Sequence, residues 1–329
     1  MRITFMVGNG FDKRVGLRSG YDDFYKSLPD NTDNDIINSI KADTELWSDM
    51  EERLGEYYTE EIAKNPERFI EQKHELEILL ESYLLSEQKR VDYKKSDEIA
   101  LEMRNSVFDF HKTLAAKDSG AIRNLIGSIS GSLQYSFIVF NYTNVFDSCI
   151  SLMKSKYKEF SHRSNNGSLY TDGIDRVLHV HGKIDDGIVL GIDNVKQTQC
   201  QSLGESERVS DYLVKSRLND IYGELRTEDA RKMIDDSVIV CIFGLSLGIT
   251  DNMWWSRLLK LLEKNDKARL VLFTYNPAYR KDIYSKRRST EELMNRFAGI
   301  SGFTEPTWDR IKGRIHIGVN PQLFNIKLC

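Results

Sequence analysis

The 329-residue sequence predicts an α/β protein with a doubly wound, mostly parallel sheet and a large helical insertion. Short apolar runs recur along the chain, and from residue 134 onward they alternate with stretches of helical periodicity. This alternation is typical of strands that are joined in parallel by helices. Residues 31–130, in contrast, carry almost no strand signal and are rich in Glu, Lys, Leu and Ile. We therefore expect one α/β domain from residues 1–30 and 131–329, with residues 31–130 as a helical insertion or cap.

The expected strands are short apolar runs that stop at glycine or at polar residues. Residues 2–7 (RITFMV) form the first, and residues 237–243 (SVIVCIF) give the strongest strand signal in the chain. The other expected strands are residues 134–140, 177–180, 269–275 and 314–317. Residues 187–190 can pair with the strand at 177–180 across an Asp-Asp-Gly turn. We interpret residues 161–173 as a polar loop.

Helical periodicity predicts the insertion and the connections between strands. Residues 44–58 place Trp47, Met50 and Leu54 on one face of a helix. Pro66 stands where a first helical turn favours proline, and a long amphipathic face follows it. The further expected helices are residues 97–115, 119–129, 145–157, 206–226, 251–263 and 290–298. We interpret the many charges of the insertion as a solvated outer face.

Composition and charge exclude several classes of protein. Hydrophobic residues make up 40% and charged residues 29%, as in ordinary soluble domains, and a net charge of −4 gives no overall attraction to nucleic acid or anionic membranes. The apolar run at residues 3–7 is too short for a signal-peptide core, and glycines interrupt the one at 238–249. The four cysteines form no CxxC pair. We expect a cytoplasmic protein with reduced cysteines and no membrane segment. The charge gives no strong nucleic-acid signal, and a local basic patch is left open.

Four stretches share one form, an apolar strand that stops at glycine and polar residues. They are GNGFD at residues 8–12, FNYT at 140–143, HVHG at 179–182 and FGLSLGITD at 243–251. In open α/β sheets, ligands bind at the carboxyl edge of the strands. We therefore expect the four strand ends to converge on one crevice that takes a nucleotide, which makes the α/β part a nucleotide-binding domain.

The first of these ends is similar to the start of a dinucleotide-binding turn. Gly8 and Gly10 would let backbone N–H groups approach a pyrophosphate at the start of a helix. The full G-x-G-x-x-G pattern is absent because position 13 is lysine, so a tight turn without a ligand is the alternative. A carboxylate at Asp12 would repel a diphosphate. Asp12 is therefore expected to cap the helix, hold a ribose hydroxyl or face a cationic part of the ligand.

The two histidines of HVHG lie two residues apart and therefore point to one face of a strand. A metal pair is one interpretation, but no other cluster of His and Cys completes such a site, and we expect no metal. His181, at the strand end, is the candidate general base because histidine titrates near working pH. His179 is expected to be a structural hydrogen-bonding residue. A satisfied core histidine is the alternative for His181.

The last strand end carries Gly244 and Ser246, whose small size lets a ligand approach the backbone. Thr250 or Asp251 is expected to cap the helix that follows. In the insertion, a W-x-x-x-E pattern ends at Glu51 and has the i, i+4 spacing of one helix face. Glu51 therefore either faces the crevice or lies exposed in solvent.

Taken together and in this order, the stretches GNGFD, W-x-x-x-E, FNYT, HVHG and FGLSLGITD resemble the AbiH family of bacteriophage abortive infection proteins. The likeness spans nearly the whole chain. More distantly, the order is similar to the sirtuin-like fold, in which a glycine turn, a T-N-Y-D segment and a catalytic H-G histidine surround NAD. The resemblance implies a Rossmann-like or sirtuin-like sheet and a role in phage defence.

The resemblance makes Asn141 the catalytic asparagine and His181 the base, and Asp12 then stabilises the positive charge that develops on the ribose. The residues expected to bind NAD are Gly8, Asn9, Gly10, Gly244, Ser246 and Asp251, with no metal. The chain departs from the sirtuin pattern in its bulkier first turn and at Thr143, which replaces an aspartate. The zinc-binding cysteine module of protein deacetylases is missing, so deacetylation is not expected.

These observations predict a hydrolase that cleaves the nicotinamide–ribose bond of NAD in phage defence. The alternative is a non-catalytic nucleotide-binding sensor or partner-binding module, which the bulky first turn and the carboxylate of Asp12 favour. A nuclease finds little support because the sequence shows no acidic metal-binding cluster and no basic groove. The expected partner is a nucleotide, and a phage-derived trigger and a homo-oligomer are left open.

Overall fold

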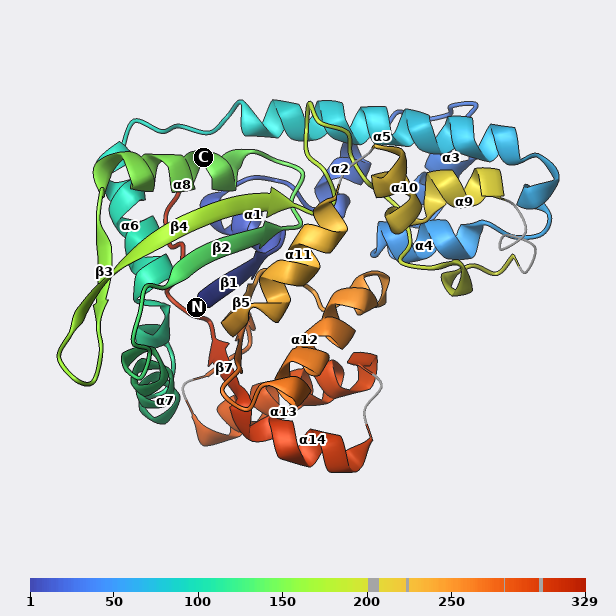
Figure 1. Ribbon diagram of the computed structural model, residues 1–329. Helices are drawn as coiled ribbons and strands as arrows, with labels where there is room; N and C mark the ends of the chain where they lie inside the picture. Colours follow the sequence, from blue (N-terminus) through green and yellow to red (C-terminus); the bar gives the residue numbers. More distant parts are fainter. Residues whose placement is uncertain (201–206, 223–224, 281, 302–303) are drawn as a thin grey trace.

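The computed structural model describes residues 1–200, 207–222, 225–280, 282–301 and 304–329 (Figure 1). Its centre is a seven-stranded sheet with the order β3-β4-β2-β1-β5-β6-β7. The strands are β1 (Arg2–Val7), β2 (Gln134–Val139), β3 (Phe160–Arg163), β4 (Leu169–His179), β5 (Ser237–Phe243), β6 (Arg269–Thr274) and β7 (Ile315–Val319). All neighbours pair in parallel except β3, which runs antiparallel to β4. The predicted α/β class with a mostly parallel sheet is confirmed.

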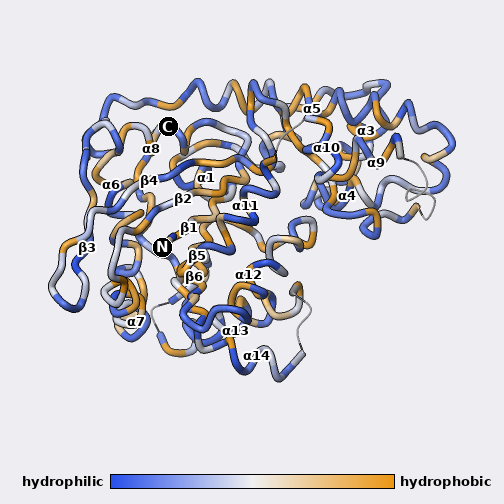
Figure 2. The backbone as a smooth tube through the Cα atoms, in the orientation of Figure 1, coloured by the Kyte–Doolittle hydropathy of each residue, from blue (hydrophilic) through white to orange (hydrophobic). Residues whose placement is uncertain are grey.

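Helices cover both faces of the sheet, since successive strand residues point to opposite sides. Phe5 of β1 packs into the core on one face, and Met6 packs into the core on the other. The first face is covered by α1 (Gly10–Val15), α6 (Ser96–Phe108), α7 (Ala116–Gly127) and α8 (Val145–Lys156). The second is covered by α11 (Arg226–Asp235), α12 (Asn252–Lys264), α13 (Ile283–Ser301) and α14 (Glu305–Ile311). In Figure 2 the hydrophobic colour concentrates on the central strands, as this layered packing requires.

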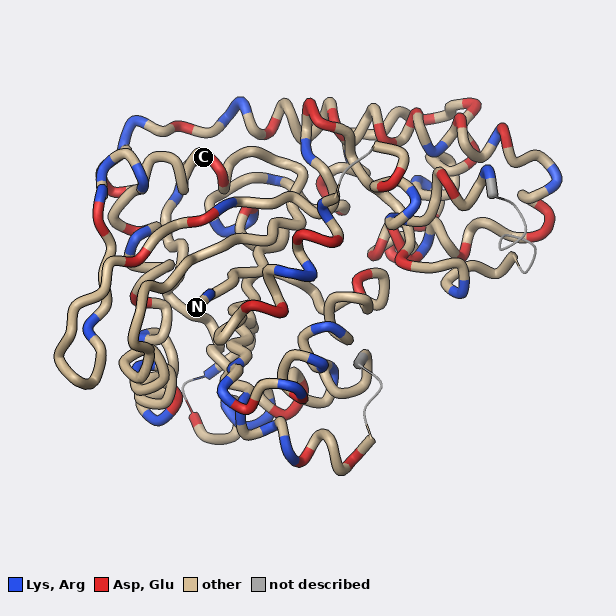
Figure 3. The backbone as a smooth tube through the Cα atoms, viewed as in Figure 1, with Lys and Arg blue, Asp and Glu red and all other residues tan. Residues whose placement is uncertain are grey.

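A second group of helices packs around a core of its own. It comprises α2 (Tyr21–Ser27), α3 (Asp35–Ala42), α4 (Met50–Tyr57), α5 (Pro66–Gln88) and α9 (Glu207–Leu213), with α10 (Lys215–Ile221) against α9. Figure 1 places this group on the side toward which the arrow of β4 points, and Figure 3 shows acidic and basic residues interspersed along α5. The domain division at residues 31–130 stays a prediction. Within that range, α3 to α5 belong to the second core, whereas α6 and α7 pack on the sheet.

The edge of the sheet differs from the prediction. Residues 161–173, interpreted as a polar loop, belong to the hairpin of β3 and β4. The polar, partly exposed side chains of this edge form no apolar run, so the sequence carries no strand signal there. The strand expected at 187–190 is a single antiparallel bridge between Gly182 and Ile188, because the chain turns through Asp185 and Gly187 at φ values of 70° and 77°.

Three predicted helices also need correction. The helix expected at 44–58 begins only at Met50, where the Asp49 side chain caps it by accepting a hydrogen bond from the Glu52 N–H at 3.1 Å. The helix expected at 97–115 ends at Phe108. The helix expected at 206–226 is two helices, α9 and α10, separated at Val214, and residues 206, 223 and 224 lie outside the described residues.

Two glycine turns, one after β1 and one after β5, lie against each other. The Gly10 N–H donates to the Gly244 oxygen at 2.9 Å, and a Cβ on Gly10 would stand 2.4 Å from the Gly244 Cα. We expect Gly10→Ala to lower the free energy of unfolding by about 1–3 kcal/mol, because the two turns must separate. Urea unfolding checks this. The control is Gly120→Ala on α7, where nothing lies within 4 Å of the added Cβ, and an equal effect of both changes would contradict the prediction.

Candidate functional site

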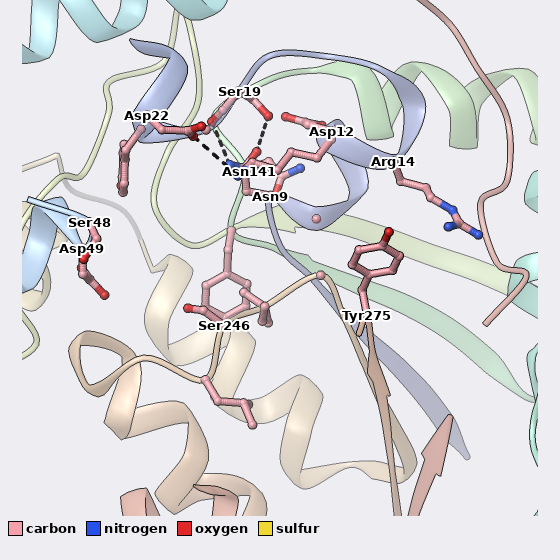
Figure 4. A pocket seen from close by; sticks show the side chains of 18 of the residues that line it. Asn9, Asp12, Arg14, Ser19, Asp22, Ser48, Asp49, Asn141, Ser246 and Tyr275 are labelled. Atoms are coloured by element: carbon pink, nitrogen blue, oxygen red, sulfur yellow. Dashed lines mark hydrogen bonds and ion pairs between the residues drawn. The ribbon is translucent and has the colours of Figure 1, made fainter. Parts of the chain in front are cut away.

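A cleft of about 1460 Å³ lies at the carboxyl edge of the sheet, and residues of the second helical group form part of its wall. All four predicted strand ends reach it, and Figure 4 labels residues from three of them, Asn9 and Asp12, Asn141, and Ser246. The predicted site residues that line it are Asn9, Gly10, Asp12, Asn141, His181, Gly244, Ser246 and Asp251. Gly8 is tied to β5 instead, because its N–H donates to the Phe243 oxygen at 2.9 Å. The expected convergence on one crevice is present, whereas the catalytic and binding roles stay predictions.

Asp12 is buried in the first turn of α1, with 1% of its surface exposed. Its Oδ2 accepts a hydrogen bond from the Thr143 hydroxyl at 2.7 Å, and its Oδ1 is buried with no partner. Burial raises the pKa of Asp12 to about 6, although the Thr143 hydroxyl and the nearby Asn141 carboxamide oppose the rise. A carboxyl group with such a pKa changes its charge close to neutral pH, as the acids and bases of active sites commonly do.

Asn141 lies just beyond β2 and turns its side chain into the cleft (Figure 4). Its Oδ1 and Nδ2 are both buried and make no hydrogen bond of good geometry. Its backbone oxygen accepts a hydrogen bond from His179 Nδ1 at 2.8 Å, and His179 Nε2 pairs with Asp147 at 2.7 Å. His179 therefore ties the end of β4 to the end of β2, which agrees with its predicted structural role. The carboxamide lies close enough to the Asp12 carboxylate to oppose the rise of its pKa, but it makes no hydrogen bond of good geometry, so Asn141 is a candidate for ligand contact.

Three N–H groups of the first turn are engaged within the protein. The hydrogen bonds are Gly8 N–H to Phe243 O, Gly10 N–H to Gly244 O and Phe11 N–H to Gly8 O, each 2.9 Å long. Asn9 is held by Ser19, whose hydroxyl donates to Asn9 Oδ1 and whose backbone oxygen accepts from Asn9 Nδ2 at 2.7 Å (Figure 4). The contact of two turns therefore explains the glycines without a ligand. A pyrophosphate would find these three N–H groups already used.

A buried cluster of four titratable side chains adjoins these residues. Lys215 Nζ donates to Glu51 Oε2 at 2.8 Å, to Asp251 Oδ1 at 3.0 Å and to the Thr250 backbone oxygen at 3.2 Å. Asp251 Oδ1 also lies 3.2 Å from His181 Nε2. The cluster thus joins the chain beyond β4 and β5 to α4 and α10. Asp251 is committed to Lys215 and His181, so its side chain does not cap α12 as predicted.

The pKa values in this cluster follow from burial and from its own charges. Burial alone would lower the pKa of Lys215, but the carboxylates of Asp251 and Glu51 outweigh burial and raise it. Burial acts to raise the pKa of Asp251, but Lys215 and His181 outweigh burial and hold that pKa well below its usual range. At Glu51 burial dominates and raises the pKa despite Lys215. The cluster therefore holds one buried ammonium between two carboxylates.

Sequence reasoning missed Lys215 and left the position of Glu51 open. Glu51 is 7% exposed and lines the cleft, which overturns the exposed alternative. Among the described residues, no group of three or more His, Cys, Asp or Glu is arranged to hold a metal ion. In the same part of the chain, no helix combines the length and the apolar character that crossing a bilayer requires.

Comparison with known proteins gives the family. The family model described as "Bacteriophage abortive infection AbiH" matches residues 4–274, which include all four strand ends and Glu51. None of the curated proteins compared matches the chain. The predicted resemblance to the AbiH family is confirmed over most of the sequence, whereas the likeness to the sirtuin-like fold stays a prediction. The chain belongs to the AbiH family of bacteriophage abortive infection proteins, and this membership implies a role in phage abortive infection.

Proposed function

We propose that this AbiH protein hydrolyses the nicotinamide–ribose bond of NAD in a sirtuin-like site at the carboxyl edge of its sheet. The observation that carries the proposal is a set of buried polar atoms, on residues that line one cleft, that make no hydrogen bond of good geometry: Asp12 Oδ1, Asn141 Oδ1 and Nδ2, and Glu51 Oε1. Buried polar atoms are normally hydrogen-bonded. Hydroxyl groups both donate and accept hydrogen bonds, so a ligand with several hydroxyl groups would satisfy these atoms. A ribose meets this need.

The size and lining of the cleft also support a dinucleotide. Its volume of about 1460 Å³ exceeds the ~300–1,000 Å³ that small-ligand pockets usually have. The glycine turn offers few N–H groups to phosphates, but the side chains of Lys13, Arg14 and Lys327 line the same cleft. These cations, instead of backbone N–H groups, would bind the diphosphate.

The residues take the following parts in the reaction. Water adds to C1′ of the ribose as the bond to nicotinamide breaks, and the bonding electron pair leaves with the nicotinamide nitrogen. His181 takes the proton from the water, and the Asp251 carboxylate stabilises the resulting imidazolium. Asp12 stabilises the positive charge on the ribose, and Asn141 orients its hydroxyls. The products are nicotinamide, ADP-ribose and one proton.

Chromatography of NAD incubated with the purified protein tests this proposal. We expect the wild type to release nicotinamide in at least one of two reactions, one with the protein alone and one with added lysate of phage-infected cells as the trigger. His181→Ala and Asn141→Ala should each lower the rate by about a hundredfold, because each removes one catalytic group. His74→Ala, at an exposed histidine on α5, is the matched control and should keep the full rate. Absence of nicotinamide in every wild-type reaction would refute hydrolysis.

A second candidate function is a sensor that binds a nucleotide without turnover. The buried carboxylate of Asp12 beside the first turn and the bulky side chains of Asn9 and Phe11 in that turn favour this candidate. Calorimetry separates the two, since tight binding of intact NAD with no product supports the sensor. For either function we propose a cytoplasmic protein whose nucleotide-binding domain is residues 1–30 and 131–329, with a phage-derived trigger and a homo-oligomer as candidate partners.

A further inference from the structure

We propose that Glu51 is a substrate-contacting residue, a second carboxylate of the cleft that accepts a hydrogen bond from a ribose hydroxyl, and that Lys215 is the positioning residue that holds it. This inference rests on the proposed function and adds a residue from the helical group to the site. Figure 4 shows Ser48 and Asp49, which precede Glu51, across the cleft from Asp12. The ribose would therefore meet carboxylates on two walls.

The position of Glu51 is set by its helix. Asp49 caps α4, so Glu51 lies in the first turn, and its neighbours Met50 and Leu54 are buried in the core of the second helical group. The carboxylate reaches the boundary between that core and the strand ends, where it lines the cleft at 7% exposure. A glutamate is seldom buried to this extent without a specific partner.

The hydrogen bonds of Lys215 leave one oxygen of Glu51 for a ligand. An ammonium group has three N–H donors, and Lys215 directs them to Glu51 Oε2, Asp251 Oδ1 and the Thr250 oxygen. No donor of Lys215 remains for Glu51 Oε1, which is buried and has no hydrogen-bond partner. The cluster therefore holds the Glu51 carboxylate at the wall of the cleft and leaves its second oxygen without a donor from the protein.

A counter-ion role alone does not account for Glu51. Asp251 already neutralises Lys215, and its Oδ1 lies 3.0 Å from the ammonium. A second buried carboxylate adds a desolvation penalty that a purely structural pair would not need. Groups held in such costly positions at a cleft are typical of functional sites.

The experiment measures kcat for NAD in Glu51→Gln, in the matched control Glu52→Gln, and in a double variant that combines Glu51→Gln with Lys215→Met. Glu52 is the exposed neighbour on the same helix. We expect Glu51→Gln to lower kcat by about a hundredfold with its melting temperature retained, and Glu52→Gln to keep the wild-type kcat. The double variant should be no faster than Glu51→Gln. Wild-type kcat in Glu51→Gln, or its recovery to within about threefold in the double variant, would overturn the proposal.

Failure of the proposed function gives a different pattern. If the wild type releases no nicotinamide, calorimetry with ADP-ribose tests Glu51 directly. Binding at least tenfold weaker in Glu51→Gln than in the wild type supports the contact, and equal affinity refutes it. A wild type that neither turns over NAD nor binds ADP-ribose refutes both proposals.

Discussion

Replacing Asp12 with asparagine is expected to lower the rate of NAD hydrolysis by about a hundredfold to ten-thousandfold and, at pH 7 and above, to raise the free energy of unfolding. The rate falls because a neutral carboxamide cannot stabilise positive charge on the ribose. The stability rises because the wild-type protein must keep an ionised carboxylate in a buried place, with one oxygen unpartnered. Opposite effects of one change on activity and stability are characteristic of a strained functional group.

The pH dependence follows from the direction of the pKa shift. Folding raises the pKa of Asp12 from 3.8 to about 6, so the native state binds the proton more tightly than the unfolded chain. The contribution of Asp12 to stability is fully present below pH 3.8 and is lost as pH rises through about 6. The loss is at most about 3 kcal/mol, since one pKa unit corresponds to about 1.4 kcal/mol. Asparagine carries no charge at any of these pH values, so the Asp12→Asn variant does not undergo this loss of stability.

Urea unfolding at pH 4, 6 and 8 checks the prediction. The advantage of Asp12→Asn over the wild type should be small at pH 4 and should grow to its full size at pH 8. Asp97→Asn on the exposed surface is the control and should show no such trend. The wild-type rate should rise with pH through about 6, as the Asp12 carboxylate forms. A stability difference that does not change with pH would refute the assignment.

The central sheet could be predicted because its strands are buried on both faces. The run of β5 is apolar from residue 238 to residue 243, and every residue of that strand is buried. Parallel strands bring their carboxyl ends to one edge, so the meeting of the four polar strand ends also followed from the sequence. The hairpin of β3 with the first part of β4 could not be predicted, because its side chains are mostly polar and form no apolar run.

The site was predicted only in part, for a related reason. Asp12, Asn141 and His181 stand beside glycine turns or at strand ends, where local sequence gives their place. Lys215 stands in a polar helix, and its partner Glu51 is 164 residues away along the chain. Burial of a lysine depends on which elements pack together, and no local pattern reports this. The engaged N–H groups of the first turn likewise depend on contact between the ends of β1 and β5.

Replacing Lys215 with methionine is expected to lower the free energy of unfolding by about 3–5 kcal/mol, because it leaves two buried carboxylates without their shared ammonium. Lys215 is 4% exposed, and its ion pairs with Glu51 and Asp251 are 2.8 and 3.0 Å long. Methionine fills the volume of the aliphatic stem, so the loss reports the charge rather than a cavity.

Urea unfolding at neutral pH measures this loss, with Lys260→Met, at an exposed lysine of α12, as the matched control. Addition of Glu51→Gln to Lys215→Met removes one of the two buried carboxylates that have lost their ammonium partner. The double variant should therefore regain a large part of the lost free energy of unfolding. A loss no larger than that of Lys260→Met would mean that water solvates the carboxylates and that the cluster is open. Asp251 Oδ1 contacts both Lys215 and His181. Lys215→Met should therefore also displace His181, the proposed base, and lower the rate of NAD hydrolysis by the folded protein.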